Sequence, residues 1–255
     1  MKIIYRLYAD SLAMPRADDG VGLHLTYPEQ LRAQLHEKGV DATILNRARG
    51  GTTLGALGEL FLADSGYFGT TTRGVAILQC GIVDCAPRPI PLWARRGLAR
   101  LPGHIRAPIV KTLHRNRAQI LRSGIQFRFT GPTQFRTRYA EIIGRASAEC
   151  DHVYAISIAP TITGTEGHSP GLSESIRLYN SLIEHAVRVQ PKPNITVIDV
   201  CDAITRSGRP TADFISPVDG HHLTAEGHRM YASLVSRAEV SRLADASAIC
   251  SDEIR

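Results

Sequence analysis

The 255-residue sequence predicts a three-layer α/β sandwich with a mostly parallel sheet of about five strands. Short apolar runs rich in β-branched residues recur along the chain, which is typical of strands buried on both faces of a sheet. Segments with apolar residues at helical spacing separate these runs. Strands that alternate with helices in this way pair in parallel, because each helix returns the chain to the same end of the sheet.

The individual elements follow from these patterns in order. Gly39 is typical of the end of the first long helix, and Thr224 is suited to cap the last one. We expect strands at residues 2–8, 41–46, 74–80, 152–159 and 194–200, and helices at residues 27–38, 133–149, 173–189 and 225–239.

The chain is predicted to form one domain over residues 1–240, because no linker divides it and its 43% hydrophobic residues can fill one core. Residues 241–255 are expected to be a C-terminal tail. Residues 86–130 do not follow the strand and helix alternation: five prolines precede a basic helical stretch. We expect this segment to be an insertion after the third strand, forming a cap over the site.

No apolar run is long enough for a signal peptide or a membrane span, so we expect a soluble, cytoplasmic protein. The five cysteines form no C-x-x-C pair, which favours reduced, buried thiols over disulfides or zinc ligands. The histidines are scattered, and no phosphate-binding glycine loop of the G-x-x-x-x-G-K type occurs. No metal or cofactor is therefore expected.

The formal charge of +6 is uneven, because no Asp or Glu lies between Arg88 and Arg138. A basic stretch of this kind is often only a solvated face, but it also suits an anionic partner. Nucleic acid is not expected, since no zinc-finger, RNP-like or recognition-helix pattern accompanies the charge. An anionic small substrate, an acidic glycan or peripheral contact with an anionic membrane fits the composition. The oligomeric state is left open.

In open parallel sheets, ligands bind at the carboxyl ends of the strands. Ser11 follows the first expected strand, and Gly51 follows the second. The segment 81–84 follows the third, and His221 and His222 precede the last helix. These segments are therefore expected to meet at one edge of the sheet.

Four segments in this order resemble the sequence blocks of the SGNH hydrolases, also called GDSL esterases. Ala-Asp-Ser-Leu at 9–12 resembles the G-D-S-L block, and residues 46–53 resemble the second block, whose glycine aligns with Gly51. Residues 81–84 stand where the third block, G-x-N-D, is expected. Asp219 and His222 match the D-x-x-H block. The resemblance implies a flavodoxin-like fold and ester hydrolysis, with a backbone N–H at Gly51 serving the oxyanion hole.

The residue types also fit this chemistry directly. A serine hydroxyl becomes nucleophilic when an imidazole, oriented by a carboxylate, removes its proton. We expect Ser11 as the nucleophile, His222 as the base and Asp219 as its orienting carboxylate. Backbone N–H groups of Ser11 and Gly51 would stabilise the oxyanion. His221 is a competing base that the three-residue spacing disfavours, and His228 is expected to be structural.

One position departs from the pattern. Val83 replaces the asparagine that donates a side-chain N–H to the oxyanion in the family, and an ionised Asp84 would repel the oxyanion. We hypothesise that Arg88, four residues further along the same loop, supplies the missing donor. Membership of the basic face is the alternative for Arg88. Further contacts with substrate are expected at the positions next to the site: Asp10, Asp84, Arg88 and His221.

Three classes of function remain open. The first is an esterase that removes an O-acyl group from a carbohydrate or a small metabolite. The second is an O-acyltransferase that uses the same triad with a sugar or nucleotide-linked acceptor. The third is a binding module that keeps the fold and is catalytically degenerate.

Overall fold

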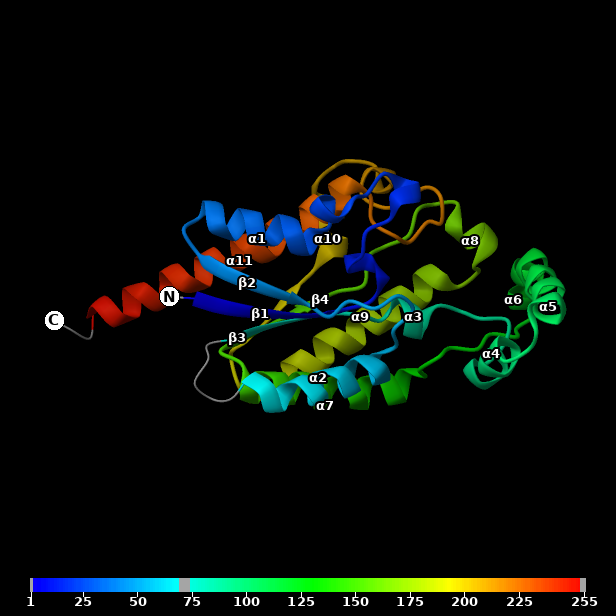
Figure 1. Cartoon of the computed structure of the whole chain (residues 1–255), viewed down its shortest axis with the longest axis horizontal. Coiled ribbons are helices and arrows are strands. Elements are labelled where there is room, and N and C mark those ends of the chain that lie inside the picture. The colour runs from blue at the N-terminus through cyan, green and yellow to red at the C-terminus, as the bar shows by residue number, and fades with distance from the viewer. Residues whose placement is uncertain (1, 69–73, 253–255) are drawn as a thin grey trace.

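The computed structural model describes residues 2–68 and 74–252. Its centre is a five-stranded sheet in which every strand is parallel to its neighbours, in the order β2-β1-β3-β4-β5 (Figure 1). All residues of the central strands β3 and β4 are buried, which explains their continuous apolar runs. The predicted fold class is thereby confirmed. The strands are β1 Lys2–Ala9, β2 Asp41–Asn46, β3 Gly74–Gln79, β4 His152–Ile156 and β5 Ile195–Ile198.

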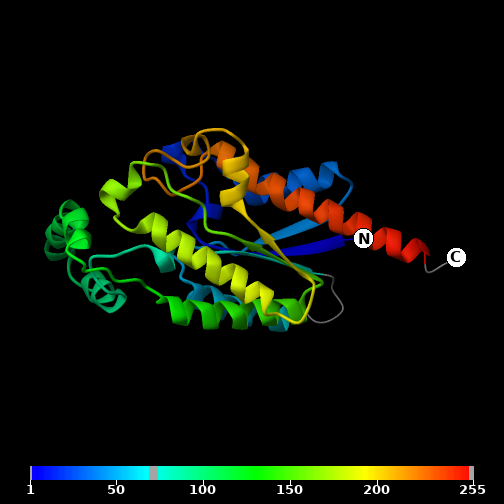
Figure 2. The ribbon, with the colours of Figure 1, turned by 180° about the vertical axis from the view of Figure 1, so that it is seen from behind.

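Helices cover both faces of this sheet. Figure 2, the view from behind, shows the same two helical layers as Figure 1. One layer contains α1 (Tyr27–Glu37) and α11 (Ala225–Asp252), which pack against each other. The other contains α2 (Leu54–Phe68), α7 (Pro132–Glu149) and α9 (Leu172–Arg188). Three short helices lie in the connections: α3 Ile82–Cys85, α8 Thr165–His168 and α10 Val200–Arg206.

The strand order places a topological switch point between β1 and β3. From β1 the chain crosses to β2 on one side, and from β3 it continues to β4 on the other. The loops after β1 and β3 therefore diverge and leave a crevice at the carboxyl ends of these strands. Ser11 and the segment 81–84 lie at this crevice.

The inserted segment carries three helices. In Figure 1, α4 (Leu92–Ala99), α5 (Gly103–Arg115) and α6 (Arg117–Arg122) lie together at the end of the molecule, beyond the carboxyl ends of the strands. Pro91 and Pro102 stand immediately before α4 and α5, where a missing N–H costs nothing. A two-residue bridge closes the base of the segment, with N–H to O=C distances of 2.8 and 2.9 Å between Arg88 and Phe127. The segment thus forms a separate lobe.

The short helices α3, α8 and α10 were not expected, and two longer helices, α2 and α11, also differ from the sequence-based expectations. α2 was not expected, because its glycines weaken the helical signal. Gly58 is needed for packing, since a Cβ there would lie 2.8 Å from Cδ1 of Ile142 on α7. α11 continues to Asp252 instead of ending at residue 239, because no proline or glycine follows Gly227 to stop it. The expected tail is therefore largely helical.

Two further observations concern the whole chain. Within residues 2–68 and 74–252, no helix is both long and apolar enough to cross a membrane. The four cysteines whose side chains are described are free thiols, namely Cys80, Cys85, Cys150 and Cys201. The side chain of Cys250 lies outside the described residues.

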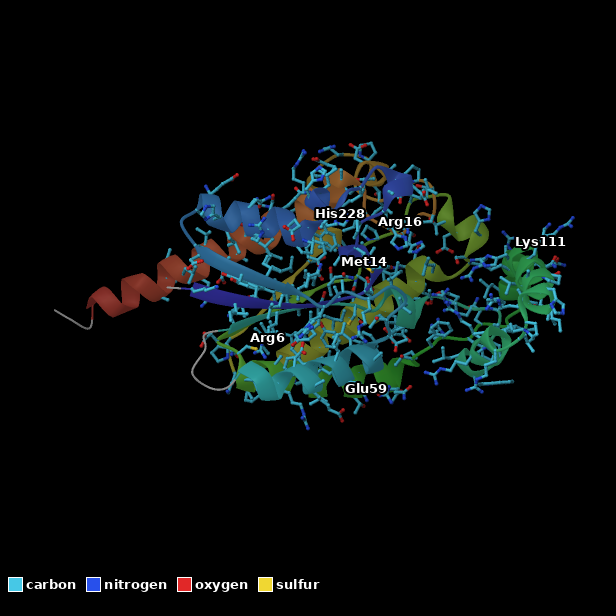
Figure 3. The ribbon with its side chains drawn as sticks, in the orientation of Figure 1. Arg6, Met14, Arg16, Glu59, Lys111 and His228 are labelled. Carbon is cyan, nitrogen blue, oxygen red and sulfur yellow. The ribbon has the colours of Figure 1, made fainter. Side chains whose placement is uncertain are left out.

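His228 joins the two helices of one layer. Its ring, labelled in Figure 3, is 1% exposed, and Nδ1 accepts a hydrogen bond of 3.0 Å from the backbone N–H of Tyr27 at the start of α1. Burial lowers the pKa of His228 to about 4, because the charged imidazolium is poorly solvated there and cannot accept this bond. His228 therefore has a structural role.

A pH dependence of stability follows from His228. Between pH 6.5 and 4 the unfolded chain binds more protons at this position than the folded chain, so the free energy of unfolding falls as the pH decreases. The full contribution is on the order of 3 kcal/mol. Urea unfolding at pH 7 and pH 4.5 should show a smaller loss of stability in His228→Asn than in the wild type. Equal losses in the two proteins would exclude this contribution.

Candidate active site

Ser11 lies at the carboxyl end of β1. It begins a single turn of 3₁₀ helix, Ser11–Ala13, whose N-cap is Asp10. Asp10 is fully buried, and its Oδ1 accepts 3.0 Å hydrogen bonds from the backbone N–H of Leu12 and from Nε2 of Gln79. Burial raises the pKa of Asp10 to about 6 despite these two bonds. The expected substrate contact of Asp10 is therefore replaced by a role in fixing the turn that presents Ser11.

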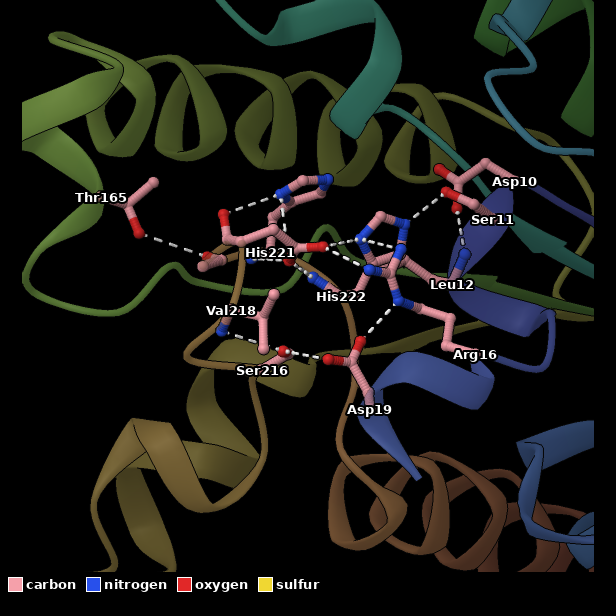
Figure 4. A network of polar contacts seen from close by, with 12 residues as sticks. Asp10, Ser11, Leu12, Arg16, Asp19, Thr165, Ser216, Val218, His221 and His222 are labelled. Atoms are coloured by element: carbon pink, nitrogen blue, oxygen red, sulfur yellow. Dashed lines mark hydrogen bonds and ion pairs between the residues drawn. The ribbon is translucent and has the colours of Figure 1, made fainter. Parts of the chain in front are cut away.

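His222 and Asp219 complete a hydrogen-bonded series with Ser11 (Figure 4). Nε2 of His222 lies 2.9 Å from Oγ of Ser11, and Nδ1 lies 2.6 Å from Oδ2 of Asp219. The other carboxylate oxygen of Asp219 accepts the backbone N–H of His222 at 3.0 Å. Burial favours the neutral acid, but the bonds from His222 outweigh it and hold the pKa of Asp219 well below its usual range. The arrangement keeps the proton on Nδ1 and leaves Nε2 free to accept from Ser11.

The loop that carries these two residues depends on Gly220. Its φ of 75° is in the left-handed region, and a Cβ at this position would collide with the side chain of Thr165. The tight turn brings Asp219 and His222 close enough for the carboxylate to bond both the ring and the backbone of His222. The three-residue spacing seen in the sequence has this turn as its structural cause.

Arg16 braces the carboxylate of the series. Its Nη2 lies 2.9 Å from Oδ2 of Asp219, and its Nε lies 2.5 Å from Oδ2 of Asp19. Asp19 in turn accepts a 3.0 Å hydrogen bond from Oγ of Ser216, at the start of the loop that holds His222 (Figure 4). Nη1 of Arg16 is also 3.0 Å from Nδ1 of His222. Because that nitrogen donates to Asp219, the bond of Arg16 to the carboxylate is the one that holds the loop.

Arg16 and Asp19 were not expected from the sequence. Both lie in the irregular connection between β1 and α1, where neither periodicity nor a motif marks a side chain. Only the folded chain brings them to Asp219, which is some 200 positions away.

Arg16→Gln should lower kcat about tenfold or more and leave KM nearly unchanged, because it removes a charge-assisted hydrogen bond to Asp219 without touching the substrate cavity. Arg16→Lys should recover part of the rate. Arg32→Gln, which removes an exposed ion pair on α1, is the matched control. Steady-state hydrolysis of p-nitrophenyl acetate measures all three variants. A rise in KM alone would contradict the positioning role.

Gly51 lies in the turn that follows β2. Its φ of 68° requires glycine or strain, and no side chain crowds the position. The backbone N–H of Arg49 bonds the carbonyl of Ala9 at 3.1 Å, and a Cβ at Gly50 would lie 3.8 Å from Sδ of Met14. The turn is therefore held against the segment that carries Ser11.

A cavity of about 600 Å³ lies in front of Ser11. We name it the catalytic cavity. Asp219 and His221 line it from the last loop, and residues of the inserted segment close the opposite side. The residues of the inserted segment in its wall are Ala86, Arg88, His114, Arg115, Arg117 and Ala118. The inserted segment thus contributes to the cavity wall, and its role as a cap stays a prediction.

Comparison with solved structures finds this architecture in ester hydrolases. The lipase/acylhydrolase of Enterococcus faecalis has a TM-score of 0.61 at 17% identity, over 95% of this chain and 97% of that one. A member of the lipolytic G-D-S-L family from Veillonella parvula has a TM-score of 0.59 at 14% identity, over 92% and 96%. An acetylxylan esterase from Geobacillus stearothermophilus has a TM-score of 0.59 at 12% identity, over 92% of each chain. The chain has the SGNH hydrolase fold.

No protein-family model matches the sequence, and a search of curated proteins finds no match. The low identity is consistent with a shared fold whose sequence similarity is confined to the short sequence blocks. The expected SGNH hydrolase fold is confirmed, and it covers nearly the whole chain.

The segment 81–84, which stands in place of the third SGNH block, lacks the side-chain donor of the family pattern in the structure as well as in the sequence. Val83 is 7% exposed, lines the catalytic cavity and offers no donor there. Arg88 lines the same cavity, with its guanidinium 4.9 Å from the ring centroid of Phe129. The hydrogen bonds and ion pairs among the described residues do not join Arg88 to Ser11 or His222. Its part in the oxyanion hole stays a prediction.

Asp84, the last residue of the third block, is fully buried outside the cavity wall. Both of its carboxylate oxygens accept from the backbone N–H of Leu54, at 3.1 and 3.0 Å, and it also bonds the hydroxyl of Thr130. Burial raises its pKa to about 6. The expectation that Asp84 contacts substrate is therefore wrong: its carboxylate holds the start of α2 at the sheet edge.

His221 lies beside His222, the residue expected to act as the base. Its ring packs against His222 with centroids 4.2 Å apart, and its Nδ1 lies 3.1 Å from the backbone carbonyl of Asp219. Burial, together with the neighbouring His222, lowers the pKa of His221. It is placed to contact a substrate in the cavity, whereas His222 is the residue that meets Ser11.

The ligand atoms of Asp219, His221 and His222 lie within 4.8 Å of one another, as a metal site would require. Arg16 already places a positive charge 2.9 Å from this carboxylate, and His222 is engaged with Ser11 and Asp219. These hydrogen bonds and the ion pair with Arg16 already engage the ligand atoms of Asp219 and His222.

Proposed function

We propose that the protein is a serine-dependent ester hydrolase of the SGNH type, which removes an O-acyl group from a carbohydrate or a small metabolite. The observation that carries the proposal is the hydrogen-bonded series from Ser11 through His222 to Asp219 beside an open cavity. The esterases and lipases that share the fold support the same reaction class.

The geometry suits acyl transfer in two steps. Nε2 of His222 takes the proton of Ser11 as Oγ attacks the ester carbonyl, and the imidazolium then returns it to the departing alcohol. Water attacks the acyl-enzyme in the second step, assisted by the same imidazole. Asp219 stabilises the imidazolium through its 2.6 Å bond to Nδ1. Backbone N–H groups of Ser11 and Gly51 would donate hydrogen bonds to the developing oxyanion.

Labelling with a fluorophosphonate followed by peptide mapping tests the proposal. An activated Ser11 attacks the phosphorus, loses its proton to His222 and expels fluoride, so the label should map to the peptide that contains Ser11. Prior incubation with a slowly hydrolysed ester should protect it. An unlabelled Ser11 in a folded protein would overturn the proposal and favour the degenerate binding module.

Product analysis distinguishes hydrolysis from acyl transfer to a sugar. With p-nitrophenyl acetate as donor, a hydrolase should release acetate whether or not a sugar or a nucleotide sugar is present. An O-acyltransferase would instead form an acetylated sugar in proportion to the acceptor concentration. Product analysis by mass spectrometry distinguishes the two.

A further inference from the structure

A second cavity, of about 410 Å³, lies inside the inserted segment. We name it the arginine cavity. Arg88, His114 and Arg117 line both this cavity and the catalytic cavity, so the two adjoin. Apolar side chains form much of the rest of its wall, among them Leu98 of α4, Val110 and Leu113 of α5, and Phe129. A molecule with its ester at Ser11 would reach the arginine cavity directly.

Four arginines line this cavity without carboxylate partners. They are Arg88, Arg95, Arg106 and Arg117. The ion pairs among the described residues involve none of them, whereas Arg16, Arg47, Arg209 and Arg242 elsewhere in the chain each pair with a carboxylate. The sequence explains the difference, because no Asp or Glu occurs between Asp84 and Glu141. The segment therefore cannot neutralise its own arginines locally.

The guanidinium groups are held close together. Those of Arg88 and Arg95 lie 4.9 and 5.3 Å from the same ring centroid, that of Phe129. Nε of Arg88 is buried without a hydrogen-bond partner. Arg117 is anchored by a 2.5 Å bond to the carbonyl of Pro87 and a 2.8 Å bond to Oγ of Ser169. Burial, with the nearby charges of Arg117 and Arg95, lowers the pKa of Arg88 to about 10. Placing these positive charges close together is electrostatically unfavourable unless a bound anion offsets their charge.

We propose that the arginine cavity binds an oxyanion group, a carboxylate or a phosphate, on the alcohol part of the ester substrate. A guanidinium matches these groups with paired N–H donors and brings a full positive charge to them. The inference rests on the proposed function for its ester chemistry. It narrows the proposed substrate to esters whose alcohol carries a carboxylate or a phosphate, such as an O-acylated acidic sugar or sugar phosphate. Arg88 and Arg117 are partly buried in the cavity wall, whereas Arg95 and Arg106 are exposed there; Lys111, labelled in Figure 3, is exposed on the lobe outside the wall.

A matched set of substrates tests the proposal. O-acetylglucose, O-acetylglucuronic acid and O-acetylglucose 6-phosphate differ only in the charged group. We expect the wild type to favour one of the anionic esters at least about tenfold in kcat/KM over the neutral one. The preferred ester distinguishes carboxylate from phosphate. A ratio near one would overturn the proposal.

Two variants test whether the preference for anionic esters arises in the arginine cavity. Arg95→Gln/Arg106→Gln removes two charges from the cavity wall and should lower the anionic-to-neutral ratio about tenfold. Arg96→Gln is the matched control, because Arg96 lies next to Arg95 on α4 but outside the wall. Equal ratios in the double variant and in Arg96→Gln would overturn the proposal and assign the preference to the basic surface as a whole.

A binding measurement without turnover separates this inference from the proposed function. Inorganic phosphate, added to Ser11→Ala at constant ionic strength, should raise its Tm. The same rise should occur in Ser11→Ala/Arg96→Gln and be lost when Arg95 and Arg106 are replaced. Phosphate binding in an enzyme that hydrolyses no ester would overturn only the ester chemistry. Hydrolysis without phosphate binding or anionic preference would overturn only the anion site.

Discussion

Ser11→Ala is expected to lower kcat/KM for p-nitrophenyl acetate by on the order of 10⁴-fold or more. The variant removes the hydroxyl that we propose to form the acyl-enzyme, while His222 and Asp219 keep their places. Its free energy of unfolding should change by about 1 kcal/mol or less, because Ser11 is half-buried at a sheet edge and its hydroxyl bonds only to His222 among the described residues. Steady-state kinetics and urea unfolding measure the two effects.

Ser181→Ala is the control for this substitution, since Ser181 is an exposed serine of α9 far along the chain from the site. It should behave as the wild type in both measurements. Turnover retained in Ser11→Ala would remove the nucleophile assignment. Loss of activity accompanied by unfolding would point to a structural role of the Ser11 turn.

Arg88→Ala is expected to lower kcat on the order of 10²-fold while KM for a neutral ester changes little, if Arg88 supplies the donor that Val83 lacks. Such a donor acts mainly on the charge that develops in the transition state. Val83→Asn should then restore part of the rate in the Arg88→Ala background, because an amide N–H at this position would point into the cavity that Val83 already lines. Val83→Leu, which adds no donor, is the control.

A change in KM instead of kcat would indicate a different role for Arg88. A rise in KM confined to anionic esters would assign Arg88 to the arginine cavity, in line with its contact with Phe129 and its proximity to Arg117. The oxyanion would then depend on backbone donors alone. Kinetics with the neutral and anionic acetylated sugars therefore decide between the two roles of one side chain.

Sequence alone was sufficient for the fold because the strands are local and strongly marked. All five expected strands occur within a few residues of their predicted bounds, since continuous burial of a parallel strand demands an apolar, β-branched run. α2 was missed because its glycines, which allow close contact with α7, resemble those of a loop. Packing against a distant helix, which no local window contains, determined that element.

The same distinction applies to the site. The sequence by itself indicated the three residues that we propose as the triad, because Ser11, Asp219 and His222 lie in short blocks whose spacing encodes local turns. The tertiary structure decided the rest: it buried Asp10 and Asp84 as backbone anchors, brought Arg16 to Asp219 and gathered arginines of the inserted segment around one cavity. Local turns depend on neighbouring residues, whereas burial and charge pairing depend on contacts between residues far apart in the chain.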